Sequence, residues 1–76
     1  MVKKKFTWQF NGYDSLKIAE HQMNHLKEFF EREKIKILDI GTKNINEFVS
    51  ISFVIADEKF EEIIKNALKP HFISKD

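Results

Sequence analysis

The chain is 76 residues long, 42% apolar and 33% charged, with a net charge of +1. A chain of this length buries roughly 60–65% of the surface that it exposes when unfolded, and it forms one domain around one core. Cysteine is absent, which excludes disulfides and thiolate metal sites, and the balanced charge disfavours strong non-specific binding to nucleic acids. No apolar run approaches the roughly 20 residues of a membrane helix, and the start of the chain does not resemble a secretory signal, so we expect a cytoplasmic protein.

The first segment predicts a half-buried strand over residues 4–11, because large apolar side chains recur at every second position. These side chains are Phe6, Trp8 and Phe10. A turn, "NGYD", follows over residues 11–14, and either Asp14 or Ser15 can accept a hydrogen bond from a first-turn amide as a helix N-cap. We expect the three aromatic rings to be buried under helices, which disfavours a base-stacking role for them.

Residues 16–33 have helical spacing, with apolar side chains three or four positions apart along one stripe. The stripe comprises Leu16, Ala19, Met23, Leu26 and Phe30. A second set of side chains beside it, which we name the outer column, comprises Ile18, Gln22, His25 and Phe29. Because two members are apolar, the outer column is either the edge of the core or a contact surface for a partner.

Two histidines of this helix, His21 and His25, lie one turn apart. Side chains at this spacing share one face of a helix and can chelate a divalent metal. However, they lie almost opposite the apolar stripe. We therefore interpret them as ordinary histidines on a solvated face, and expect no metal site.

Two further strands are expected in the second half of the chain. The run "IKILDIG" predicts a strand over residues 35–41, and "TKNINE" predicts a polar loop over residues 42–47. The next strand covers residues 48–56 and alternates, so its two faces differ. We expect Val49, Ile51, Phe53 and Ile55 to face the core, and Ser50 and Ser52 to face solvent.

The chain closes with a second helix. Asp57 is a natural N-cap, and the acidic residues that follow it complement the positive end of the helix dipole. Pro70 ends this helix, because its ring disfavours helical geometry at the preceding residue. Residues 71–74 can add a short edge strand.

The order of elements is therefore β-α-β-β-α, with an optional fourth strand, in a single domain over residues 1–76. This order predicts an α+β fold of the two-layer, ferredoxin-like type. Each helix has one apolar stripe, so both helices should pack on one face of an antiparallel sheet. The expected side chains of the open face include Thr7, Gln9, Ser50 and Ser52.

The stretch "IKILDIGTKNINEFVSISFVIADEKFEEIIKNAL" over residues 35–68 resembles the second half of an ACT domain, in particular the regulatory ACT domains of aspartate kinases. The matching pieces are Ile35-Lys36-Ile37, the loop over residues 42–47, the strand over residues 51–55, and Ala67-Leu68. The resemblance implies binding of amino acids or other small effectors where the first strand meets the first helix, often across a dimer interface made by sheets that join edge to edge. The resemblance therefore implies a ligand site at Asn11, Gly12, Tyr13 and Asp14.

Two hypotheses about function follow. In the first, the chain is a non-enzymatic, ACT-like regulatory or binding module that senses a small effector, such as an amino acid, and forms a homodimer. In the second, it is a small interaction protein, an inhibitor or adaptor, that binds a protein partner through the serines of the open face or through the outer column. Ser15-Leu16 stands where many ACT domains have Pro-Gly, which favours the second hypothesis. Neither hypothesis assigns a catalytic residue, a metal ligand or a cofactor.

Overall fold

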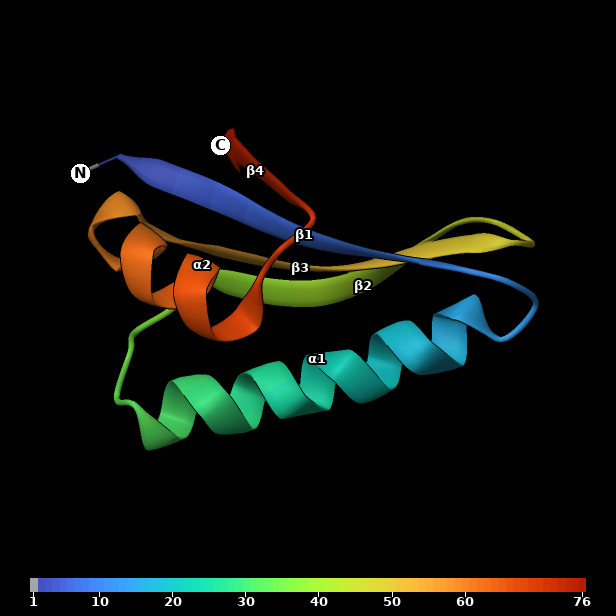
Figure 1. The fold of residues 1–76 in the computed structure, drawn as a ribbon, viewed down its shortest axis with the longest axis horizontal. Helices are drawn as coiled ribbons and strands as arrows, with labels where there is room; N and C mark the ends of the chain where they lie inside the picture. The colour runs from blue at the N-terminus through green and yellow to red at the C-terminus, as the bar shows by residue number, and fades with distance from the viewer. Residues whose placement is uncertain (1) are drawn as a thin grey trace.

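Four strands and two helices make up the fold, which a computed structural model describes for residues 2–76 (Figure 1). In chain order they are β1 (Lys3–Asn11), α1 (Ser15–Arg32), β2 (Asp39–Asn46), β3 (Val49–Asp57), the 3-10 turn η1 (Glu58–Phe60), α2 (Glu61–Leu68) and β4 (Phe72–Lys75). The strands form one sheet in the order β2-β3-β1-β4, and every neighbouring pair is antiparallel. The predicted α+β class, with an antiparallel sheet, is confirmed.

The first strand and helix lie where the sequence predicts them, but the helix start is built differently. The carboxylate of Asp14 makes no hydrogen bond to the first-turn amides. The hydroxyl of Ser15 lies in the interior, 2.9 Å from the hydroxyl of Ser50. The predicted side-chain cap is therefore absent at Asp14, and Ser15 serves the core instead.

The second strand lies four residues later than predicted, and most of the predicted polar loop belongs to it. The cause is the way α1 ends. Lys34 adopts a left-handed conformation with φ 56°, its amide donates to the carbonyl of Glu31, and the amide of Ile35 donates to the carbonyl of Phe30. This pair of bonds is a Schellman motif, in which an apolar residue after the helix packs back on it. Ile35 is buried as that residue, and so it is not part of β2.

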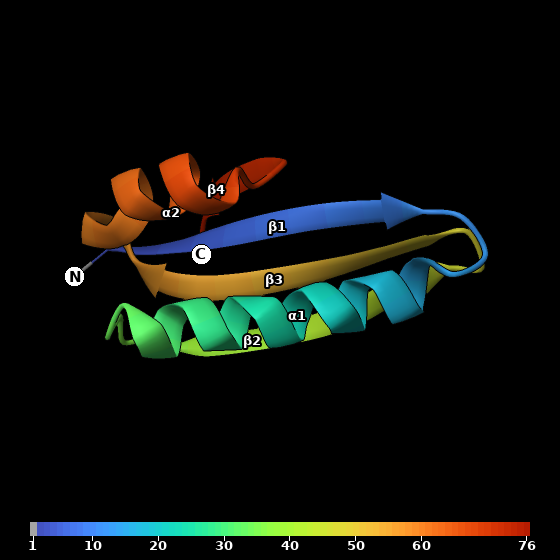
Figure 2. The same ribbon diagram turned by 60° about the horizontal axis from the view of Figure 1, so that its bottom comes forward.

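Both helices cover the same face of the sheet. Phe6 and Trp8 of β1 are buried there together with Leu26 and Phe30 of α1 and Ile64 of α2. Figure 2 shows α1 running along β2 and β3, while α2 lies beside β1. The indole N–H of Trp8 donates to the carbonyl of Leu68 at 2.8 Å, which ties the end of α2 to the centre of the sheet.

The predicted orientation of β3 is wrong. Ser50 and Ser52 face the helices and are fully buried, whereas Ile51, Phe53 and Ile55 lie half-buried on the opposite face. The register of β1 and β3 explains the reversal, because residues directly opposite each other in an antiparallel pair share a face. Trp8 lies opposite Ser52, and Phe10 lies opposite Ser50. The large rings of β1 take up the space on the helix side, so that side of β3 carries small residues.

The end of the chain follows the prediction closely. The carboxylate of Asp57 accepts a hydrogen bond from the amide of Lys59 at 3.0 Å and so caps η1, which leads into α2. The chain then reverses at Lys69, and β4 pairs with β1 at the edge of the sheet. Neither helix among the described residues is both long and apolar enough to cross a membrane.

Candidate functional site

The face of the sheet turned away from the helices, here the open face, carries a row of apolar side chains. We name Ile51, Phe53 and Ile55 of β3, with Phe72 of β4, the apolar ridge. The first three are half-buried, and Phe72 is 56% exposed. Ladder partners place the ridge among the polar residues Thr7 and Gln9 of β1. An open face of this kind is a candidate contact surface, since exposed apolar groups that lie together mark sites of interaction.

Phe53 is the centre of the apolar ridge. Its ladder partners are Gly41 on one side and Thr7 on the other. A Cβ added at Gly41 would lie 3.0 Å from the ring of Phe53, so the ring lies over the bare backbone of the glycine. The ammonium of Lys5 lies 5.0 Å from the ring centroid, within the range of a cation–π contact. The ring is therefore held between a glycine and a lysine.

Charged residues border the apolar ridge in a regular way. Asp39 of β2 and Lys5 of β1 both lie opposite Ile55, on either side of it, and Lys43 and Gln9 flank Ile51 in the same manner. Asp39 and Lys43 are exposed, and Lys5 is half-buried. The open face thus carries an acid and a base on opposite sides of one apolar residue, at the same level along the strands.

The predicted partner-binding serines are not on this surface. Ser50 and Ser52 are both 0% exposed, so neither can contact a partner on the open face. The hydroxyl of Ser50 instead makes two hydrogen bonds, one with the hydroxyl of Ser15 at 2.9 Å and one that it accepts from the side-chain amide of Asn44 at 2.8 Å. The hydroxyl of Ser52 has no hydrogen-bond partner among the described residues.

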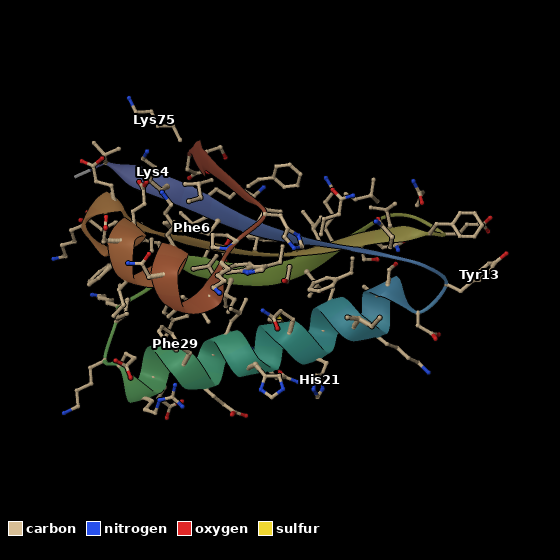
Figure 3. All side chains as sticks on the ribbon, in the orientation of Figure 1. Lys4, Phe6, Tyr13, His21, Phe29 and Lys75 are labelled. Carbon is tan, nitrogen blue, oxygen red and sulfur yellow. The ribbon has the colours of Figure 1, made fainter. Side chains whose placement is uncertain are left out.

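The predicted effector site is an exposed turn at one end of the molecule, beside the β2–β3 hairpin (Figure 3). Gly12 takes φ 115° there, a conformation that favours glycine, and its amide donates to the carbonyl of Phe48. Tyr13 is 81% exposed, and its ring meets that of Phe48 edge-on at 4.7 Å. Asn11 and Asp14 are also exposed.

A hollow in the surface lies away from this turn. It has a volume of about 210 Å³ and is lined by residues of the α1–β2 connection and of the η1 region. These residues are Lys36, Leu38, Asp57, Lys59 and Phe60. The η1 region and the predicted turn lie at opposite ends of the molecule (Figure 1), so the hollow and the predicted effector site are separate.

The outer column of α1 divides into two parts. Phe29 is half-buried and packs against the core, with its ring edge-on to Phe30 at 5.4 Å. Ile18 is 45% exposed and Gln22 is half-buried, while His25 is exposed. His25 bonds to His21, which projects from the side of α1 away from the sheet (Figure 3). The column is therefore core edge at Phe29 and free surface at Ile18.

Sequence reasoning missed the apolar ridge because it assigned those residues to the core. A signal was available in the sequence, since β1 has one strongly apolar face and β3 carries large side chains on one face and small ones on the other. The layer between the sheet and the helices is closely packed, so it has no space for large side chains from both β1 and β3. Large side chains on β1 therefore require small ones beside them on β3.

Comparison with known proteins does not add to this picture. No family model, no curated protein and no solved structure matches the chain. The ACT resemblance thus stays a prediction, and the function is argued from the open face alone.

Proposed function

We propose that this chain is a small non-enzymatic binding module of the ferredoxin-like type, and that it forms a homodimer through the open face of its sheet. The fold type is supported by the path of the chain. β1 and β2 are both antiparallel to β3, which lies between them, and α1 connects them. Two parallel strands split by a third and joined through a helix are the mark of the split β-α-β arrangement.

The apolar ridge is the observation that supports a contact surface. Ile51, Phe53 and Ile55 recur at every second position of β3, one of the two central strands, and Phe72 extends the ridge across Thr7 to the edge. Water contact with such groups is unfavourable by about 25 cal/mol for each Å² of apolar surface. A second apolar face placed on the ridge removes that contact.

The charges around the apolar ridge indicate that the partner bound by the open face is a second copy of the same chain. Consider two open faces that meet about a two-fold axis parallel to β3. The axis places β2 of one copy over β1 of the other, because β2 and β1 lie on opposite sides of β3. Asp39 then meets Lys5 of the second copy, and Lys43 meets Gln9. Each contact occurs twice, as in any isologous interface.

The other two-fold axis in the interface plane, perpendicular to the strands, also pairs opposite charges. It places β2 over β2 with reversed direction, so Asp39 meets Lys43 of the second copy. Either axis pairs the carboxylate with a lysine and stacks Ile51, Phe53 and Ile55 on the same side chains of the second copy, and the second axis also brings Phe72 over its counterpart. The face is thus complementary to itself in charge as well as in apolar character.

The size of the face indicates a weak dimer. β1 and β3 pair over nine residues, a length of about 30 Å at 3.3 Å per residue. Four strands about 4.8 Å apart give a face of roughly 500 Å² on each copy. The two faces together cover roughly 1,000 Å², at the lower limit for specific interfaces. We therefore expect a dimer that dissociates on dilution.

Sedimentation of the chain over a range of concentrations tests the dimer. About the first axis, Asp39→Lys and Lys5→Asp should each weaken association by placing like charges together, and an equimolar mixture of the two variants should restore it, because the new lysine of one variant meets the new carboxylate of the other. About the second axis only Asp39→Lys should weaken association, because Lys5 meets Gln9 there. Lys43→Asp distinguishes the axes: it leaves the first arrangement nearly unchanged and weakens the second.

Two results would contradict the proposal. One is a strict monomer up to millimolar concentration, which would leave the apolar ridge to a different protein and favour the inhibitor or adaptor hypothesis. The other is a dimer that the charge reversals and an additional ridge variant, Phe53→Asp, all leave intact. In that case the copies associate elsewhere.

A further inference from the structure

Two histidines on the solvent side of α1 lie in direct contact. The Nε2 atoms of His21 and His25 are 2.9 Å apart, and the ring centroids are 4.5 Å apart with the planes at 79°. Both residues are exposed, and His21 projects away from the sheet (Figure 3). Because both side chains are exposed, an ion from solvent can reach their Nε2 atoms.

The distance between the two nitrogens suits a particular coordination angle. Metal–imidazole bonds are about 2.0–2.1 Å long. Two such bonds whose nitrogens are 2.9 Å apart meet at the metal at about 90°. An angle of about 90° separates neighbouring ligands in the tetragonal complexes of Cu²⁺ and Ni²⁺. Tetrahedral Zn²⁺ needs nitrogens about 3.4 Å apart, which two exposed rings reach by turning, and the choice of metal therefore follows from the general order of affinity, in which Cu²⁺ exceeds both Ni²⁺ and Zn²⁺.

We infer that, contrary to the expectation from the sequence, His21 and His25 form a two-nitrogen site for a divalent transition metal such as Cu²⁺ or Ni²⁺. The contact requires one ring to present Nε2–H and the other an Nε2 lone pair. On binding, the donating ring gives up that proton and takes one from solvent at Nδ1, and both rings turn so that their Nε2 lone pairs converge on the ion. The helix holds the two rings one turn apart, which gives the second nitrogen a high effective concentration once the first has bound.

The remaining coordination positions face solvent. Among residues 2–76 no three His, Cys, Asp or Glu side chains gather as metal ligands, so water completes the coordination of the ion. The site is thus open, unlike the closed four-ligand sites that hold structural zinc. It lies on the far side of α1 from the open face of the sheet, and its loading is independent of the dimer proposed above.

Calorimetric titration of the untagged chain with NiCl₂ tests the site. We expect one ion per chain, and at least about a tenfold loss of affinity in His21→Gln and in His25→Gln, because each variant removes the chelate. His71→Gln is the matched control. It removes the third histidine, which lies outside α1 and whose Nδ1 accepts a hydrogen bond from the backbone amide of Gln9. This variant should bind Ni²⁺ with the affinity of the parent chain. Circular dichroism verifies that each variant remains folded.

Nuclear magnetic resonance with CuCl₂ locates the ion independently. At substoichiometric Cu²⁺, paramagnetic broadening should centre on the imidazoles of His21 and His25 and on the neighbouring amides of α1. Broadening centred on His71, or unchanged Ni²⁺ affinity in both α1 variants, would overturn the inference. So would an affinity in the parent chain no higher than in His21→Gln, since a single exposed histidine then accounts for the binding.

Discussion

The two buried serines of β3 should respond in opposite ways to the same substitution. Both are 0% exposed, and both lie beside an aromatic ring of β1. They differ in their hydrogen bonds. Ser50 bonds to Ser15 and to Asn44, whereas the hydroxyl of Ser52 has no partner within residues 2–76. Removal of one oxygen atom at each position therefore isolates the contribution of the hydrogen bonds.

The expected changes follow from the partners. Ser50→Ala leaves the hydroxyl of Ser15, which is 1% exposed, without its bond, and an unsatisfied buried polar group costs about 1–3 kcal/mol. Ser52→Ala removes a buried hydroxyl that is itself unsatisfied, so we expect a gain of up to about 1 kcal/mol. The two variants should thus differ by about 2 kcal/mol, within the range of about 1–4 kcal/mol that the two effects span. For a domain of 60–100 residues, that difference corresponds to roughly 10 °C in Tm.

Urea unfolding of the dilute protein measures both changes. Trp8 is the one tryptophan of the chain and is 3% exposed, so its fluorescence reports loss of the core. The double variant Ser15→Ala/Ser50→Ala should cost less than the sum of the single variants, because it removes both partners of one bond. Equal destabilisation by Ser50→Ala and Ser52→Ala would falsify the assignment of these hydroxyls.

Three further substitutions test separate contacts, the first two by the same unfolding assay and the third by sedimentation. Lys34→Gly should stabilise the chain by about 0.5–1 kcal/mol, because a side chain at φ 56° is strained; loss of stability would argue against the left-handed end of α1. Trp8→Phe removes the donor to the carbonyl of Leu68 and should cost at least about 1 kcal/mol, and an unchanged Tm would mean that the bond contributes nothing. Gly41→Ala places a methyl group 3.0 Å from the far end of the half-buried Phe53 side chain, so the ring must tilt from its place on the apolar ridge and the dimer should weaken; tighter association would contradict the proposed interface.

Local signals were sufficient for much of this fold. The alternation of Phe6, Trp8 and Phe10 predicted β1 and its buried face correctly, and Asp57 caps the turn after β3 as expected. Such features depend on neighbours within a few residues, so the sequence carries them directly. The predicted position of β2 was wrong because of another local feature, the way in which α1 ends. The apolar residue Ile35 resembles the start of a strand, but it packs against the end of α1 through a motif at Lys34 that lacks the usual glycine.

The candidate surface depended on a choice between two faces. The alternation in β3 determined that Ile51, Phe53 and Ile55 lie on one face and Ser50 and Ser52 on the other, and this is correct. A period of two does not determine which face meets the helices. The usual assumption, that the larger apolar residues are buried, placed the serines in solvent and concealed the apolar ridge.

The sequence by itself determined the class of the fold, the position of β1, α1 and α2, and the separation of β3 into two faces, and it left the fourth strand as an option. Only the tertiary structure decided which face of β3 is open, because that depends on pairing with β1. The rings of Trp8 and Phe10 lie beside Ser52 and Ser50 in the layer under the helices, and a closely packed layer has no space for a second set of large side chains. The apolar ridge lies on the other face for that reason.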